Sequence, residues 1–499
     1  MVESCLSRTK TRGVVIMTIA VEVDFCKDNI TSFSDLAKEV LQYAHAFGRE
    51  MLRSLLEERD EELRETRDTS RYVNKGKRKT CLKTLLGNVE FKRTVYIDRA
   101  APEGHHCVHL LDEDLGIDTV GLVSPDACEA IAEAACKMSY RNASRTLAEL
   151  SGLELSPQGV WDVAQKLGAY RGEQLDRLCD LTKANRIKGC IQTKLLYEED
   201  DGIWLSLQGQ DRKKYGAGRE LKLGIAYPGV LWSGGKTGKE RRTLHNKVAY
   251  ASFESAEDYR AHKEGLIASR FDVRQIEVRI HNGDGAGWVQ GFGNADINVL
   301  DAFHRNKAIL THVQDVEYRQ NLLSLLYDGN IPLLLGCIEG MINTEPDPAV
   351  QDQYKELLNY FTNNRDGLLS AYERDIKIPE TIIPGTVHHA RLGSMESNVF
   401  TIIGNRMKGR RACWSVQGAA NLANLLCLHY TTGLSGMFNG MQAALPEAAP
   451  AIDRGPLSAA KVPLSEGKGY EYRKQADVAN VPWLHDISRY RSLTEIRLN

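Results

Sequence analysis

The chain has 499 residues, of which 26% are charged and 42% are hydrophobic, and this composition is typical of globular proteins with sizeable cores. Its formal net charge of −2 excludes a global positive field that would draw the whole chain to nucleic acid. The 11 cysteines stand singly, without a Cys-x-x-Cys pair, which argues against both a disulfide framework and the usual zinc motifs.

Positive charge is nevertheless concentrated in two stretches. Residues 212–247 contain ten Lys or Arg against two Glu, and residues 71–93 contain eight against one. Such clusters in a nearly neutral protein indicate a surface that faces a polyanion, although a merely solvated face is the alternative for either one. Because no apolar run approaches the roughly 18 residues that span a bilayer, we expect a soluble intracellular protein.

The N-terminal part is predicted to combine a long helix with a β-hairpin. After an N-terminal segment, 1–32, apolar residues recur at helical spacing over 33–68 and predict one helix. In CLKTLLGNVEFKRTVYID (81–98), Leu-Gly-Asn separates two β-rich runs, which indicates a hairpin. The helix and the basic hairpin together define a predicted region, 33–124.

A helix-turn-helix is predicted in the next region, 125–180, which opens with a helix over 125–138. Apolar spacing then marks a short helix that Gly152 can close, and Ser156 followed by Pro157 can cap and start a second one. Two helices around a tight turn match a DNA-binding motif, with an ordinary helical hairpin as the alternative. The side chains of the second helix that could face a DNA groove are Gln158, Asp162, Gln165 and Lys166.

From residue 187 the pattern changes to strands. Strand-like runs occur at 187–208, 220–232 and 246–255, followed by a helix over 256–271 and a strand over 276–285. The segment GAGWVQGF can then open a helix, and another strand is expected over 297–304.

Helical patterns dominate the remainder, from 304 to about 372 and again over 395–410 and 416–430. The ribonuclease H-like fold has the same element order: three strands, a helix, a strand, a helix, a strand and then helices. We therefore predict an α/β protein with a ribonuclease H-like catalytic core. The predicted parts are a first core segment, 187–304, an all-helical insertion, 305–385, a last core segment, 386–440, and a C-terminal tail, 441–499.

Carboxylates from the first strand, the end of the fourth strand and a late helix converge in a ribonuclease H-like core. Asp284, in HNGDGAGW, lies where the fourth strand would end, among small residues that let a metal ion and a phosphate backbone approach. Asp201, in EEDDG, is the candidate on the first strand, with the acids 198–200 as rivals that could instead form an exposed turn. Glu396 opens the late helix, where a solvated glutamate is the alternative.

Phosphodiester chemistry explains why three such acids would be needed. Two divalent cations roughly 3.5–4 Å apart neutralise the attacking and leaving oxygens. Mg²⁺ prefers carboxylates and keeps several waters, and Mn²⁺ can replace it. We therefore predict Asp201, Asp284 and Glu396 as catalytic residues and as ligands of two Mg²⁺ ions.

Linked motifs carry a more specific signal than any single acid. The segments LLYEEDDGIWLSLQGQDRKK, NKVAYASFES, NGDGAGW, LDAFHRNKAI and RMKGRRACWSVQGAANLANLL together resemble bacterial insertion-sequence transposases of the ISLre type, over about residues 20–440. The resemblance implies a DDE catalytic domain that uses Mg²⁺, contains these three acids and acts on the ends of its own element. It also implies Asp301 as a reserve metal ligand, and the implied DNA or transition-state contacts are His304, Arg305 and Lys307.

The leading hypothesis is thus a DNA transposase that cleaves one strand at the element ends and transfers the freed 3′-hydroxyl into target DNA. Its partners would be terminal inverted repeats and target DNA in the cytoplasm, at the bacterial nucleoid, and pairing two ends requires at least a dimer. The residues expected to neutralise phosphates are Arg212, Lys213, Lys214, Arg406, Lys408, Arg410 and Arg411. The alternatives are an inactive transposase-derived DNA-binding regulator and a ribonuclease H-like nuclease without strand transfer.

Overall fold

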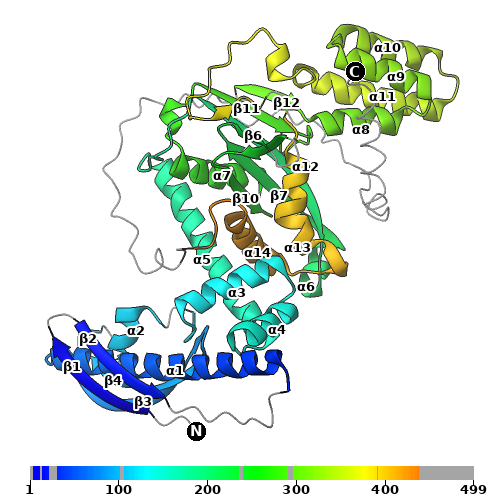
Figure 1. Ribbon diagram of the computed structural model, residues 1–499. Helices are drawn as coiled ribbons and strands as arrows, with labels where there is room; N and C mark the ends of the chain where they lie inside the picture. The colour runs from blue at the N-terminus through cyan, green and yellow to red at the C-terminus, as the bar shows by residue number, and fades with distance from the viewer. Residues whose placement is uncertain are drawn as a thin grey trace. The chain divides into compact units, whose positions relative to one another are not determined.

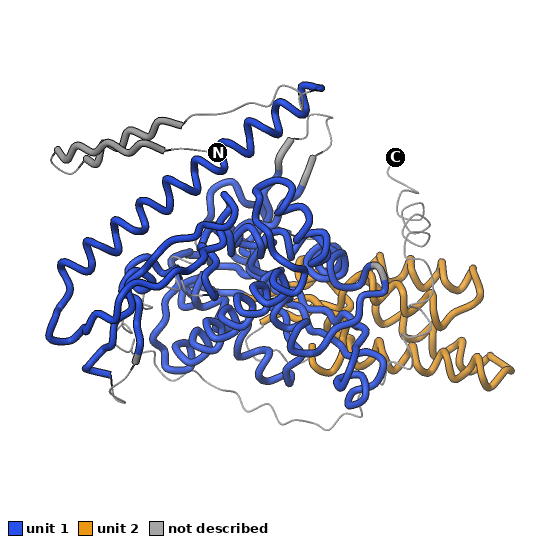
Figure 2. The backbone as a smooth tube through the Cα atoms, turned by 90° about the horizontal axis from the view of Figure 1, so that it is seen from below, with its two compact units in different colours: residues 1–278, 378–389, 394–454 blue, residues 279–377, 390–393, 455–499 orange. Residues whose placement is uncertain are grey.

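The structure is a computed structural model that describes residues 4–11, 14–21, 31–101, 106–117, 120–234, 240–289, 296–389, 392–435 and 437. The chain divides into two compact units, coloured separately in Figure 2. Unit 1 contains residues 1–278, 378–389 and 394–454, and unit 2 contains residues 279–377, 390–393 and 455–499. The architecture is mixed α/β, as predicted.

The N-terminal part of unit 1 pairs a long helix with a β-sheet. Strands β1 (Ser4–Thr11) and β2 (Val14–Val21) form an antiparallel hairpin within the segment 1–32. Helix α1 (Phe33–Thr66) follows and confirms the helix predicted over 33–68. The predicted hairpin is also confirmed, because β3 (Tyr72–Thr84) and β4 (Gly87–Asp98) pair antiparallel, and β5 (His106–Val108) adds a third strand. Figure 1 shows α1 running along this sheet, and apolar side chains such as Leu56 and Phe91 are buried there.

Four helices follow: α2 (Leu110–Leu115), α3 (Pro125–Lys137), α4 (Tyr140–Ser151) and α5 (Pro157–Lys183). Helix α4 ends at Gly152, whose φ of 68° is left-handed, and the Ser156 hydroxyl accepts a hydrogen bond from the Gly159 N–H at the start of α5. The two predicted helices are therefore present, but α5 has 27 residues and is much longer than the short second helix expected. DNA recognition by this pair stays a prediction.

The larger sheet is mixed. Its strands are β6 (Leu195–Ser206), β7 (Gly218–Tyr227), β10 (Val248–Ser252), β11 (Val278–Gly283) and β12 (Ile297–Leu300), in the spatial order β10-β7-β6-β11-β12. The first three pair antiparallel, whereas β11 and β12 run parallel.

Two local predictions in this part of the chain were wrong. Residues 220–232 are not one strand, because Pro228, which lacks an N–H donor, and Gly229 separate β7 from β8 (Val230–Gly234). Strand β8 instead joins β9 (Glu240–Leu244) and β13 (Thr386–Val387) in a small antiparallel sheet. The strand expected over 297–304 ends at Leu300, because helix α8 (Ala302–His312) begins two residues later. After β11, residues 287–289 form a turn, and the remainder of GAGWVQGF lies outside the described residues, so a helix start there is not tested.

Helices of unit 1 pack around β10. Figure 1 shows α5, α7 (Ala256–Arg270) and α14 (Val416–His429) grouped beside this strand. Helices α5 and α14 approach so closely that a Cβ on Gly168 would lie 2.2 Å from the backbone oxygen of Asn421. The segment before α14 is helical as predicted and comprises α12 (Met395–Asn398), the π-helical turn η5 (Val399–Gly404) and α13 (Asn405–Met407).

Unit 2 contains the predicted helices between 304 and 372. They are α8 (Ala302–His312), α9 (Val316–Tyr327), α10 (Ile331–Thr344) and α11 (Pro348–Asn363), followed by short 3₁₀ turns. Their apolar faces share one core that includes Ile309, Leu334 and Phe361. Within the described residues of both units, no helix is long and apolar enough to cross a membrane.

Candidate functional site

Strand β6 carries four consecutive acids, and their side chains alternate between the two faces of the sheet. Glu198 and Asp200 point toward α7, where the Lys263 ammonium lies 3.0 Å from Glu198 Oε2 and 2.5 Å from Asp200 Oδ2. The hydroxyl of Tyr259 donates a further hydrogen bond to Asp200 Oδ1. Burial lowers the pKa of Lys263, but Asp200 and Glu198 outweigh it, and the net shift is upward. These two acids are thus buried members of a charged cluster and not the exposed turn considered as an alternative.

Glu199 is fully buried on the opposite face and ties β6 to the start of α12. The Tyr227 hydroxyl donates to Glu199 Oε1 at 2.5 Å, and the Ser394 N–H donates to Glu199 Oε2 at 2.9 Å. His389 Nδ1 lies 2.7 Å from the same hydroxyl oxygen. Because the Tyr227 hydroxyl has one hydrogen and donates it to Glu199, the Nδ1 of His389 must carry a hydrogen and donate it to Tyr227. Burial, reinforced by Arg242, lowers the pKa of His389 to about 4.

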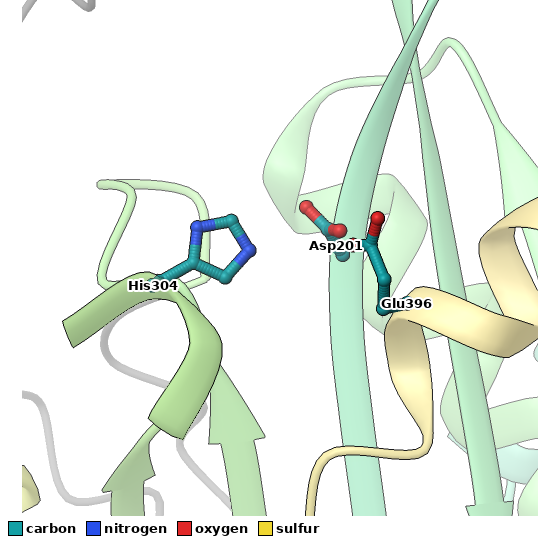
Figure 3. A group of neighbouring side chains, drawn as sticks. All are labelled: Asp201, His304 and Glu396. Carbon is teal, nitrogen blue, oxygen red and sulfur yellow. The ribbon is translucent and has the colours of Figure 1, made fainter. Parts of the chain in front are cut away.

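Asp201 and Glu396 meet beside β6, although 195 positions separate them in the sequence. Each offers a carboxylate oxygen, and these oxygens lie within 4.8 Å of each other. Figure 3 shows the two carboxyl groups side by side, one from β6 and the other from the first turn of α12. Both side chains are half-buried. Ligands of one Mg²⁺ sit about 2.0–2.1 Å from the ion, so oxygens on opposite sides of it are roughly 4 Å apart. A separation of at most 4.8 Å is close enough for this pair to share a cation.

The surroundings of this carboxylate pair include one cation. Burial lowers the pKa of Lys408, which follows α13, and the charges of Glu396 and Asp201 oppose that shift. A Cβ on Gly202, next to Asp201, would lie 2.0 Å from Glu220 Oε1 on the neighbouring strand, so the Glu220 side chain would have to move to admit one. Hard carboxylate oxygens at this spacing suit Mg²⁺ or Mn²⁺ better than softer metals, so the donor set fits the predicted cofactor.

The remaining predicted acids belong to unit 2. Asp284 follows β11, its Oδ1 accepts the Ala286 N–H at 2.8 Å, and its backbone oxygen accepts the Tyr360 hydroxyl at 2.8 Å. Gly285 has a φ of 81°, and a Cβ there would lie 2.8 Å from Asn364 Oδ1. The left-handed turn and the approach of Asn364 explain the glycine at 285, and the room for a metal ion beside Asp284 stays a prediction.

Asp301, the reserve ligand, caps a helix in unit 2. Its Oδ1 accepts the Phe303 N–H at the start of α8, and its Oδ2 accepts the Asn282 side-chain N–H, both at 2.9 Å. His304, which Figure 3 also labels, lies in the first turn of α8 with its ring edge-on to Phe303 at 5.3 Å. Lys307 lies on the same helix with its ammonium 5.6 Å from the Phe303 ring.

Three of the predicted DNA contacts are used inside the fold. The Arg406 guanidinium donates to the Ala135 carbonyl and lies 5.0 Å from the Tyr140 ring, and its burial lowers its pKa. Arg305 donates to the Leu368 carbonyl, and burial lowers its pKa as well. Gln165 bonds to α14, where its Nε2 donates to the Gly418 carbonyl at 3.3 Å and its Oε1 accepts from Asn421 at 2.9 Å. These three side chains are engaged in contacts between elements of the chain, and DNA binding by them stays a prediction.

Several of the other predicted contacts lie nearer to solvent. Helix α6 (Gly209–Tyr215) presents three exposed basic side chains, and Lys166 on α5 is exposed as well. Gln158 donates to Asp162 at 3.0 Å on the exposed face of α5. Arg410 and the exposed Arg411 belong to the 3₁₀ turn η6 (Gly409–Arg411). The three basic residues of α6 are Arg212, Lys213 and Lys214.

The basic stretch 71–93 carries less free charge than its composition indicated. Four of its eight cations have carboxylate partners, so about half of the positive charge is paired. Two of these partners belong to α1 and α2. The sequence could not show these pairs because three of the partners lie outside the stretch. The pairs are Arg71 with Asp98, Lys77 with Glu61, Lys79 with Glu90, and Arg93 with Asp112.

Comparison with known proteins links the chain to a family of unassigned function. A model of the uncharacterised protein family UPF0236 matches residues 26–438. A UPF0236 protein of Streptococcus gallolyticus, from the vanSb 3′ region, is 23% identical over 438 residues, which cover 85% of this chain and 87% of that protein. A UPF0236 protein of Caldanaerobacter subterraneus subsp. tengcongensis is 22% identical over 374 residues, 74% of each chain. Another from that organism, 22% identical over 377 residues and 74% of each chain, has a name that joins eleven loci.

Proposed function

Since the chain belongs to the uncharacterised protein family UPF0236, a relative of which is named for many loci of one genome, we propose that it is a DDE transposase of the ISLre type. Multiplication within a genome is what a mobile element produces. The observation that carries the proposal is the meeting of Asp201 and Glu396, because the fold brings together two carboxylates from distant segments as phosphodiester chemistry requires.

The proposed catalytic core is ribonuclease H-like. The strand order β10-β7-β6-β11-β12 supports it, because the first strand of the core lies centrally, between its antiparallel neighbours and the parallel pair that follows. The four helices of unit 2 precede the segment that carries Glu396, as the predicted helical insertion requires.

In this proposal, Asp201 and Glu396 hold divalent cations, with Asp284 of unit 2 as the third acid. Mg²⁺, when bound, neutralises charge on the scissile phosphate and lowers the pKa of the attacking water. Lys408 offsets the mutual repulsion of the two carboxylates and is placed to attract a phosphate. Arg212, Lys213 and Lys214 on α6 contribute phosphate contacts, so DNA binding should weaken as salt rises. We propose a dimer or larger assembly on DNA, because two element ends must be paired.

The test is cleavage and strand transfer on a duplex that carries the terminal inverted repeats bordering the gene. We expect Mg²⁺- or Mn²⁺-dependent nicking at the repeat and joining of its 3′-hydroxyl to a target duplex. Asp201→Asn and Glu396→Gln should each lower the rate on the order of 100-fold or more while leaving the gel-shift affinity in Ca²⁺ similar. Glu380→Gln is the matched control, because the Glu380 side chain is 94% exposed in a loop of unit 1.

Each outcome of this experiment separates the candidates. Sequence-specific binding without nicking would favour a DNA-binding regulator, and nicking without joined products would favour a nuclease. Wild-type rates in both the Asp201→Asn and Glu396→Gln proteins would contradict a catalytic role for this carboxylate pair.

A further inference from the structure

A cavity of about 220 Å³ lies within unit 1, between α5, β10, α7 and α14. These four elements are labelled next to one another in Figure 1. Its wall is apolar over much of its area, with residues such as Leu175, Val248 and Leu266. Ser269, Asn424, Thr431 and Thr432 also line it, and the side chains of the first three each donate a hydrogen bond to a backbone carbonyl. None of these residues belongs to the carboxylate site on β6.

Two guanidinium groups line the same cavity, Arg171 from α5 and Arg270 from the end of α7. Of the described residues that line it, none is Asp or Glu. Arg171 donates one hydrogen bond to the neutral side-chain oxygen of Gln174 at 3.1 Å. The Nε of Arg270 is buried and makes no hydrogen bond to the described residues. The cavity therefore concentrates two positive charges and an unused donor without a protein carboxylate to balance them.

The electrostatic surroundings of Arg171 agree with this description. Burial lowers the pKa of Arg171, and the groups that oppose the shift are Cys427 and Tyr170. Burial also raises the pKa of the Cys427 thiol to about 12, so this side chain is neutral near pH 7 and does not supply the missing negative charge. A largely desolvated cation without a counterion is destabilising, and an anion that enters the cavity would relieve that destabilisation.

We propose that this cavity is a binding site for a phosphate monoester or inorganic phosphate. Two guanidinium groups, one of them with an unused Nε–H on Arg270, match the several acceptor oxygens of a phosphate dianion better than the two of a carboxylate. The volume is below the roughly 300–1,000 Å³ of sites for drug-sized ligands, so it admits a phosphate with at most a small organic group. The two possible sources of this chemistry are free phosphate and the 5′-phosphate end of a nucleic-acid strand.

The experiment measures thermal unfolding of the full chain in about 10 mM sodium phosphate and in sodium chloride of equal ionic strength, with calorimetry to count bound phosphate. We expect phosphate to raise the Tm by about 2–4 °C more than chloride does and to bind once per chain. Arg171→Met removes one cation while keeping an apolar stem, and Ala249→Leu fills the cavity without changing charge. Both variants should lose the phosphate-specific rise, whereas Lys79→Met on β3, whose side chain is 66% exposed, should keep it.

Two further additions assign the ligand. A 5′-phosphorylated single-stranded oligonucleotide that raises the Tm more than its 5′-hydroxyl form identifies a strand end as the source, and a rise with inorganic phosphate alone identifies free phosphate. An equal rise in sodium acetate would overturn the assignment to phosphate. The absence of any rise beyond chloride, or the same rise in wild type, Arg171→Met and Ala249→Leu, would overturn the site itself. Should Arg171→Met fail to fold, Ala249→Leu alone decides between these outcomes.

Discussion

Replacing Lys263 by methionine should destabilise unit 1 severely, because this ammonium is the counterion of two buried carboxylates. The side chain of Lys263 is 3% exposed, and its Nζ lies 3.0 Å from Glu198 Oε2 and 2.5 Å from Asp200 Oδ2. Methionine fills a similar volume but leaves both acids without their cation. Removal of one partner from a buried ion pair costs about 3–5 kcal/mol, and we expect a value near the upper end because two carboxylates share the lysine.

The pH dependence of this loss has a definite sign. In the wild type, the raised pKa of Lys263 means that its contribution is fully present at neutral pH and is lost only as pH rises through that pKa, above about 10.5. In the Lys263→Met protein, the stranded carboxylates take up protons more readily than they do in the unfolded chain. The stability deficit should therefore be smaller at about pH 5 than at pH 8.

Urea unfolding followed by tryptophan fluorescence measures the difference, and Trp204 on β6 reports on the strand concerned. Lys79→Met is the matched control, because its partner is Glu90 and the two side chains are 66% and 60% exposed, so the change should be within about 1 kcal/mol. Adding Asp200→Asn to Lys263→Met should recover part of the loss, since it removes one of the uncompensated charges. A Lys263→Met protein within about 1 kcal/mol of wild type would refute the reasoning.

Three further predictions follow from the site and its supporting helices. The pKa of His389 is lowered to about 4, so the unfolded chain binds more protons than the folded one between that pH and about 6.5. Acidification over this interval should lower the free energy of unfolding by up to about 3 kcal/mol. In urea titrations, His389→Gln should abolish this pH dependence. Glu199 positions the start of α12, which carries Glu396, by accepting the Ser394 N–H. Glu199→Gln should therefore weaken Mg²⁺-dependent cleavage by roughly 10- to 100-fold and raise the Mg²⁺ concentration needed, with unchanged DNA affinity. An unaltered Mg²⁺ titration would contradict this role. Gly168→Ala should cost about 2–3 kcal/mol in denaturant unfolding because of its approach to Asn421, whereas Gly336→Ala on α10, with open space around it, should be neutral or stabilising by up to about 1 kcal/mol.

Local signals in the sequence were sufficient for most helices and for one hairpin. Helix α1 and the β3–β4 hairpin lie where periodicity and turn residues predicted them, and Gly152 and Ser156 act as the expected caps. The length of α5 was missed because α7 and α14, which are distant in sequence, pack against its second half. For example, α7 approaches α5 so closely that a Cβ on Gly265 would lie about 3 Å from backbone atoms of Cys179. Tertiary packing of this kind leaves no local pattern.

The candidate site shows the same division between local and distant information. Four consecutive acids on a strand imply two on each face, so the sequence contained the signal that Glu199 and Asp201 share a side. Which of the two is buried depends on Tyr227 and Ser394, and no spacing rule predicts those partners. Arg406 was assigned to DNA because its sequence neighbours are basic. Its contacts with Ala135 and Tyr140 bridge more than 260 positions and leave no local signal.

The basic residues that remain best placed for DNA are those of α6, and their position follows from the strand that carries Asp201. Strand β6 leads from Asp201 directly into α6, whose first turn is anchored because Asp211 Oδ2 accepts the Val416 N–H at 2.8 Å. Leu207 also forms a β-bridge with Trp414, in the segment that connects Lys408 to α14. The α6 cations and Lys408 are thus linked to β6, the strand that carries Asp201, through the Asp211–Val416 hydrogen bond and the Leu207–Trp414 bridge. A phosphate backbone held by α6 would be positioned by rigid elements relative to Asp201 and Glu396, which is the arrangement that catalysis by precise placement of a phosphodiester requires.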